Sequence, residues 1–127
     1  MRRSGLSGAL ASPKLGARSG RRAGVRAPRL IDIPAPGAPW SDVETFALTF
    51  DGYERHGSFK ACAKIGNRVR DGYLSGRRLP RSLDTLRTCL FFEQRRWRHF
   101  GSAPAEKDRE YIDSVLERIR EVMASAS

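Results

Sequence analysis

Apolar residues recur at helical spacing between residues 82 and 101. Intervals of three, four and seven residues place them on one face of an α-helix. This face consists of Leu83, Leu86, Leu90, Trp97 and Phe100. Phe91 and Phe92 fall outside it, so we expect the helix to contact neighbours on more than one side. The pattern predicts a central helix over residues 83–100, ended by Gly101.

Two further helices are predicted before this central one. The first begins at Ser41, where Ser41 and Glu44 have the spacing of a capping box, and ends at Gly57. Its apolar face consists of Val43, Phe46, Ala47, Phe50 and Tyr53. The second is shorter, is capped by Ser58 and stops at the Asp71-Gly72 pair. A basic loop over residues 72–81 follows it.

The fourth predicted helix starts near Ser102 and Pro104 and has the most regular apolar face in the chain. That face consists of Tyr111, Ile112, Val115, Leu116, Ile119, Val122 and Met123. Residues 124–127 are expected to fray. Since no segment alternates with a period of two residues, we predict an all-α fold, a compact bundle of about four short helices.

Residues 1–39 show no such periodicity. They consist mainly of Arg, Gly, Ala, Ser and Pro, a composition that buries too little apolar surface to offset chain entropy. We therefore expect a disordered basic N-terminal arm over residues 1–39 and a single helical domain over residues 40–124. Three roles remain open for the arm: an organellar targeting segment, a non-specific polyanion-binding arm, or an extension without function.

The formal net charge of +10 is unevenly distributed along the 127 residues. Residues 1–40 carry eight bases and one acid, whereas residues 41–127 carry sixteen bases and thirteen acids. Within the domain, residues 55–100 are strongly basic, and the segments on either side are acidic. Two interpretations follow: the acidic helices neutralise the basic middle within the molecule, or the bases bind an anionic macromolecule.

The candidate binding face consists of bases in the second helix, the following loop and the end of the third helix. These residues are Lys60, Lys64, Arg68, Arg77, Arg78, Arg95 and Arg98. The main hypothesis is a non-enzymatic module that binds an acidic protein partner through this face. The alternative is an RNA- or DNA-binding protein that uses the same arginines and the N-terminal arm. Aromatic residues interleaved with arginines, as in residues 91–100, are typical of surfaces that bind single-stranded nucleic acid.

Glu93 lies on the apolar face of the third helix, where an unpaired charge would be costly. Arg96, three residues on, is its neighbour on the helix surface. We therefore predict a buried ion pair between Glu93 and Arg96. A base from the second helix is the other candidate partner, and a ligand contact is the alternative role of Glu93.

No pattern typical of an enzyme or of a metal site is present. His56 and His99 lack a second ligand at metal-binding spacing, and phosphate-binding glycine loops and nucleophile motifs are absent. We therefore expect no catalysis, no metal and no cofactor. Cys62 and Cys89 lie among apolar residues, which favours free thiols in a cytoplasmic protein over a disulfide. No apolar run is long enough to span a membrane.

Overall fold

The computed structural model of the protein describes residues 28–126, and these residues form helices and no strand. The predicted all-α fold is therefore confirmed. The elements are a 3-10 turn η3 (Leu30–Asp32) and the α-helices α2 (Trp40–Ala47), α3 (Gly52–His56), α4 (Phe59–Leu74), α5 (Leu83–Phe100) and α6 (Glu106–Ala126). The expectation of a disordered arm over residues 1–27 lies outside the described residues.

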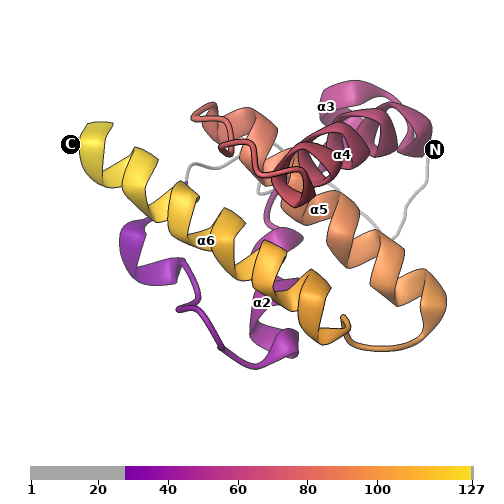
Figure 1. The fold of residues 1–127 in the computed structure, drawn as a ribbon, viewed down its shortest axis with the longest axis horizontal. Helices are drawn as coiled ribbons and strands as arrows, with labels where there is room; N and C mark the ends of the chain where they lie inside the picture. The colour runs from indigo at the N-terminus through magenta and orange to yellow at the C-terminus, as the bar shows by residue number, and fades with distance from the viewer. Residues whose placement is uncertain (1–27, 127) are drawn as a thin grey trace, which may run out of the picture.

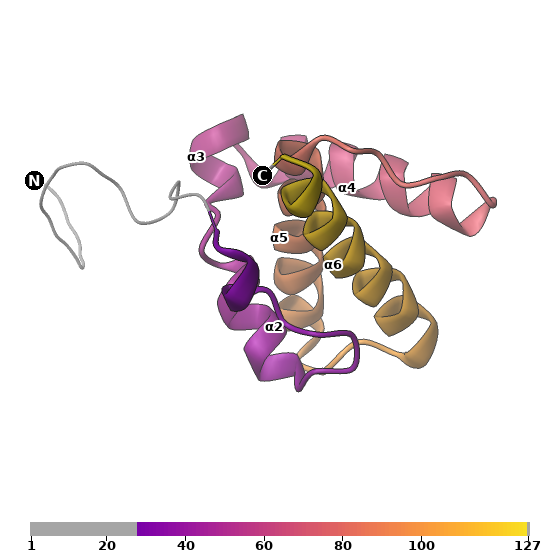
Figure 2. The same ribbon diagram turned by 90° about the vertical axis from the view of Figure 1, so that its left-hand side faces the viewer.

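Helix α5 is the centre of the fold, with the bounds expected from its periodicity. It packs against α2, α3, α4 and α6, and Figure 2 shows it between α2 and α6, with α4 crossing one end. Every residue from 86 to 94 is buried, so the helix is covered on all sides along its middle. The Ser82 side chain accepts the Thr85 amide, and Gly101 ends the helix with a φ of 71°. Both ends thus follow from local capping chemistry.

The main hydrophobic core lies between α2, α5 and α6, which come together in Figure 1. The fully buried members of the predicted α6 face all contribute to this core. These residues are Tyr111, Ile112, Val115, Leu116 and Ile119. A smaller cluster of Phe50, Cys62 and Phe91 lies where α4 and α5 approach the connection between α2 and α3. The prediction is wrong for one residue of the apolar face of α5, because Phe100 is 59% exposed.

The first predicted helix is wrong as a continuous element, because residues 48–51 separate α2 from α3. The Asp51 side chain accepts the amides of Tyr53 and Glu54 and so starts a new helix. Gly52 is buried, and a Cβ at this position would lie 2.5 Å from Phe91 Cδ2. The chain therefore turns where a residue without a side chain allows α3 to approach α5. Gly57 ends α3 with a φ of 93°, as expected.

The predicted capping box at Ser41 is also wrong. Helix α2 begins one residue earlier, at Trp40, and no side chain caps it. Ser41 lies inside the first turn, where its carbonyl oxygen accepts the Thr45 hydroxyl at 3.0 Å. The Glu44 carboxylate instead accepts a hydrogen bond from Gln94 Nε2 at 3.0 Å. The Gln94 side chain is buried, and leaving its amide nitrogen without an acceptor in the core would be costly. Glu44 therefore accepts a hydrogen bond from Gln94 rather than from the Ser41 amide.

Two other boundaries differ from the expectation. Helix α4 begins after Ser58, which accepts the Ala61 amide as predicted, but it continues past Gly72 to Leu74. Tyr73 stabilises this extra turn, because its ring packs on Tyr111 and its hydroxyl lies 3.1 Å from Ser114 Oγ. The loop is correspondingly shorter than expected. Helix α6 starts at Glu106, two residues after the predicted Pro104, and continues to Ala126, whereas residue 127 lies outside the described residues.

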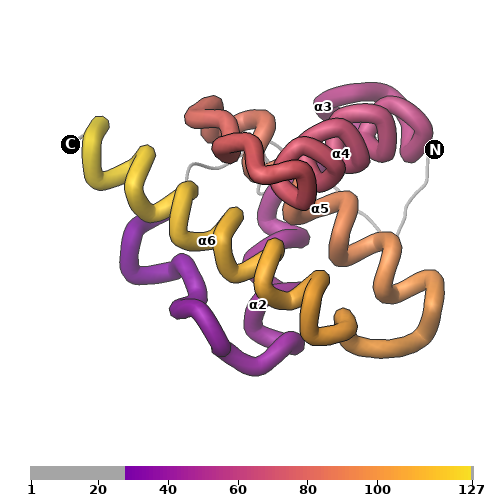
Figure 3. Tube along the Cα trace, in the orientation of Figure 1, coloured from indigo at the N-terminus to yellow at the C-terminus, as the bar shows by residue number. Residues whose placement is uncertain are grey.

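Residues 28–39 were expected to lie outside the domain, yet they pack along α6, as the tube in Figure 3 shows. Ile33 is 5% exposed and belongs to the main core. From α6, Arg120 donates to the carbonyls of Ile33 and Pro34, and Arg109 donates to the Ala38 carbonyl. These contacts are non-local, so local composition did not reveal them. The expectation of disorder is therefore wrong for this part of the arm.

Candidate binding surface

The bases that face α6 form ion pairs within the molecule. Asp108 Oδ1, at the start of α6, accepts from Arg70 Nη2 of α4 at 2.6 Å and from Arg96 Nη1 of α5 at 3.2 Å. Arg96 Nη1 also lies 3.2 Å from Glu93 Oε1. The structure therefore brings the predicted pair, Glu93 and Arg96, into contact and adds a base from α4. These charges hold three helices together.

Glu93 is 1% exposed, and Oε1 accepts a further hydrogen bond from Trp97 Nε1 at 3.1 Å. Burial raises the pKa of the Glu93 carboxyl above its usual range, although the positive charges of Arg96 and Arg70 and the Trp97 hydrogen bond oppose the shift. Arg96 also lies over the Trp97 ring, with Cζ 4.8 Å from its centroid. The pair is thus part of the packed interior, where Glu93 Oε2 is buried without a hydrogen-bond partner among the described residues.

The bases on the outer side of α4 have a different environment. Lys60, Lys64 and Arg68 are exposed and lie four residues apart along one side of the helix. Within residues 28–126, none of the three forms an ion pair, in contrast to Arg70 on the inner side of the same helix. Their charges are therefore available to a partner.

The structure does not gather all seven predicted binding residues on one face. Arg77 and Arg78 lie in the loop after α4 and border a hollow together with Ser114 and Glu117 of α6. Arg98 borders a separate hollow beside α2. Arg95 lines a third hollow together with Phe59 and Ala63 of α4, and its Cζ lies 5.8 Å from the centroid of the Tyr53 ring. The predicted face thus consists of three separate parts.

Between α3, α4 and the end of α5 lies an open groove of about 510 Å³, which we call the α4–α5 groove. Its lining residues are Tyr53, Phe59, Ala63, Asn67, Phe92, Arg95, Arg96, His99 and Phe100. Three of these rings are substantially exposed: Tyr53 at 38%, Phe59 at 46% and Phe100 at 59%. Lys60 and Lys64 do not line the groove, but each directly follows a lining residue of α4, Phe59 and Ala63, and both are exposed. No acidic side chain of the described residues lines it.

Sequence reasoning connected the rings and arginines of residues 91–100 with a binding surface, but it did not include Tyr53 or Phe59 in that surface. Tyr53 and Phe100 occupy apolar positions of predicted helical faces and were therefore also assigned to the core. Periodicity shows which side chains share a face, but it does not show whether another element covers that face. Here α3 is too short to cover the end of α5, and the three rings remain partly in solvent. The alternation of rings with Arg95, Arg96 and Arg98 was the available signal.

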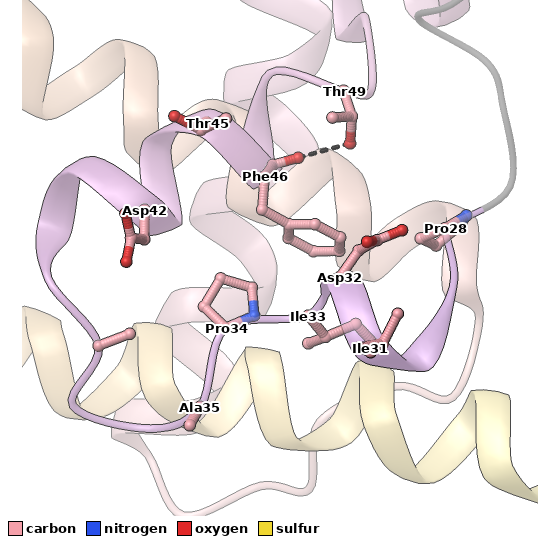
Figure 4. A pocket seen from close by; sticks show the side chains of 11 residues that line it. Pro28, Ile31, Asp32, Ile33, Pro34, Ala35, Asp42, Thr45, Phe46 and Thr49 are labelled. Atoms are coloured by element: carbon pink, nitrogen blue, oxygen red, sulfur yellow. Dashed lines mark hydrogen bonds between the residues drawn. The ribbon is translucent and has the colours of Figure 1, made fainter.

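A second groove, of about 720 Å³, lies between residues 28–38 and α2 (Figure 4). The Phe46 ring and Pro34 face each other across it, and Ile31, which is 84% exposed, stands at its edge. Its charged lining residues are Asp32 and Asp42, and Asp32 forms an ion pair with Arg29. No base lines this groove among the described residues. Its chemistry therefore differs from that of the α4–α5 groove, and it contains none of the predicted binding residues.

The two cysteines lie in the interior and are not bonded to each other. Cys62 and Cys89 are both buried free thiols, and burial raises the pKa of Cys89 to about 12. Within the part of the chain that the structure describes, no group of three His, Cys, Asp or Glu side chains is placed to hold a metal ion. Among residues 28–126, no helix is both long and apolar enough to cross a membrane.

The chain matches no protein family model, no curated protein and no solved structure. The function must therefore be inferred from the surface itself.

Proposed function

We propose that the protein is a non-enzymatic helical module that binds an acidic protein partner through the α4–α5 groove and the bases at its border. The observation that supports this proposal is the combination of exposed rings with bases that have no ion pair among the described residues, Lys60, Lys64 and Arg95. The free thiols Cys62 and Cys89 favour a reducing compartment, and we propose the cytoplasm as the place of action.

The separation of the bases into two groups supports a binding role. Arg70 and Arg96 form ion pairs with Asp108. Lys60 and Lys64, in contrast, lie one helical turn apart and repel each other. Among residues 28–126, neither lysine side chain forms a hydrogen bond or an ion pair that would stabilise the domain. Binding sites on proteins commonly combine apolar anchors with a charged border, because the anchors supply affinity and the charges supply orientation and rate.

A charge-reversal experiment tests the proposal. The triple variant Lys60→Glu/Lys64→Glu/Arg95→Glu and the control variant Arg77→Glu/Arg78→Glu are expressed with an affinity tag in the native host. We expect the wild-type chain and the control to retain the same acidic partner, identified by mass spectrometry, and the triple variant to lose it. Retention of that partner by the triple variant, with an unchanged circular dichroism spectrum, would contradict the proposal.

Nucleic acid binding is the second candidate, because exposed rings beside arginines resemble the stacking surfaces used for single strands. Affinity for phosphates falls steeply with salt, and for a single strand each lost phosphate contact reduces the slope of log affinity against log salt by about 0.7. We therefore measure binding of a labelled oligonucleotide to the wild-type chain and to the triple variant at several salt concentrations. Absence of affinity even at about 50 mM salt excludes this candidate.

A further inference from the structure

We infer that the partner presents a short acidic segment with one or two large apolar side chains, which insert into the α4–α5 groove while carboxylates on either side meet its bases. This inference rests on the proposed function and specifies the chemistry of the partner. It predicts recognition of a local segment rather than of a broad acidic surface.

The size of the groove supports a local anchor. A volume of about 510 Å³ lies within the range of sites that enclose small ligands, about 300–1,000 Å³. Phe92 is buried beneath the groove, and the exposed rings of Phe59 and Phe100 belong to its α4 and α5 walls. An inserted ring or branched aliphatic group would therefore contact apolar atoms on several sides. Such buried anchors supply most of the affinity at protein interfaces.

The distribution of charge indicates where the carboxylates of the segment lie. Arg95 and His99 line the groove on the α5 side, and on α4 the exposed Lys60 and Lys64 directly follow the lining residues Phe59 and Ala63. Along α4 the lining extends from Phe59 to Asn67, a rise of about 12 Å. About eight residues of a helix have this length. A segment of two helical turns, with apolar residues at i and i+4 and acids between them, matches this arrangement.

The rings are less suited to stacking nucleic acid bases. Arg95 already lies over the Tyr53 ring, and Arg96 Cζ lies 5.9 Å from the centroid of Phe100. A base that stacked on the covered face of either ring would have to displace a guanidinium group, and Arg96 is held by Glu93 and Asp108. Of the three exposed rings, Phe59 alone has no guanidinium over it among the described residues. A peptide anchor that enters between the rings requires no such displacement.

Three labelled peptides of about eight residues test the inference with the full-length chain. The first carries Leu at i and i+4 among Glu and Asp, the second replaces both Leu residues by Ala, and the third replaces the acids by Gln and Asn. By fluorescence anisotropy, we expect the first peptide to bind at least about tenfold more tightly than the other two, a difference of about 1.4 kcal/mol. Equal affinity of the first and second peptides would show recognition by charge alone and would overturn the inference.

Substitutions in the protein locate the binding site. Phe59→Ala and Lys64→Glu should each weaken the first peptide several-fold, whereas Leu74→Ala should not, although Leu74 is an equally exposed apolar residue at the far end of α4. Thermal unfolding checks that each variant folds. Unchanged affinity in both groove variants contradicts the inference, as does displacement of the peptide by a single-stranded oligonucleotide that binds more tightly.

The two proposals fail separately. If the native acidic partner depends on Lys60, Lys64 and Arg95 but not on Phe59 and Phe100, binding of an acidic partner through these bases stands and the anchoring segment is wrong. If charge reversal at the three bases leaves the native partner bound, the proposed function itself fails.

Discussion

Asp108 shows how one carboxylate organises the interior. Its Oδ1 atom accepts hydrogen bonds from Arg70 of α4 and Arg96 of α5, so three helices meet at one oxygen. Burial alone would raise the pKa of Asp108, but the hydrogen bonds and charges of the two arginines outweigh it, and the pKa lies below its usual value. The ionised carboxylate is therefore the form that stabilises the fold.

Replacing Asp108 by Asn should lower the free energy of unfolding by about 2–4 kcal/mol at pH 7, because two guanidinium groups lose their shared partner. The folded-state pKa is depressed, so the stabilisation is fully present above the ordinary value of about 3.8 and is lost as the pH falls through the lower, folded-state pKa. Urea unfolding from pH 7 down to pH 2 measures both effects. The wild-type chain and the variant should converge in stability at the acidic end.

The control for this substitution is Asp84→Asn. Asp84 pairs with Arg55, but both side chains are exposed, at 39% and 54%, and such pairs contribute at most about 1 kcal/mol. A loss of similar size in both variants would show that the contribution of Asp108 does not depend on its buried position.

At the scale of single elements, the two glycines of α4, one near its middle and one in its last turn, have opposite environments. A Cβ at Gly66 would lie 2.4 Å from Phe92 Cδ2, whereas a Cβ at Gly72 would meet only the Arg77 side chain at 3.7 Å. Gly66 therefore sets the distance between α4 and α5, and through Phe92 it also sets the depth of the α4–α5 groove. Gly72 has no such role.

Gly66→Ala should destabilise the domain by about 1–3 kcal/mol despite the better helix propensity of Ala, because Phe92 or the whole of α4 must move. Gly72→Ala should leave the stability unchanged or raise it by up to about 1 kcal/mol. Chemical denaturation of the two variants makes the comparison within one helix. Equal gains in both would contradict the close packing of α4 on α5.

The segment before α2 offers a second comparison. Ile33 is 5% exposed in the core, and Ile31 is 84% exposed in the same turn. Ile33→Ala should lower the free energy of unfolding by about 2–4 kcal/mol, and Ile31→Ala by less than about 0.5 kcal/mol. Thermal unfolding measures the difference. If the two variants behaved alike, residues 28–39 would not contribute to the core.

Across the whole molecule, the charges separate into an inner and an outer group. The inner arginines join α4, α5 and α6 and hold residues 28–39 against α6. The outer bases of α4, Lys60, Lys64 and Arg68, are spaced so that they repel one another. Because these like charges repel one another, we expect the outer surface of α4 to reduce the stability of the free protein.

Lys64→Gln should raise the free energy of unfolding by about 0.4–1 kcal/mol at low salt, since it removes two like-charge contacts without changing helix propensity much. The gain should disappear near 1 M salt, where charges are screened beyond about 3 Å. Urea unfolding at both salt concentrations provides the measurement. A loss of stability at low salt would instead mean that Lys64 has a stabilising partner.

The fold class and four helix ends were determined by the sequence alone, because they depend on local physics. Ser58 and Ser82 satisfy free amides at helix starts, Gly57 and Gly101 adopt the left-handed conformation at helix ends, and the apolar period identifies α5 as a buried helix.

Only the tertiary structure decided which faces are covered and which charges meet. The break before Gly52 depends on the approach of Phe91, and the burial of Ile33 depends on α6, from far along the chain. The exposure of Phe59 and Phe100 likewise depends on which helix is long enough to reach them. A spacing pattern records the neighbours of a residue along its own helix, whereas these features arise from residues brought together by packing.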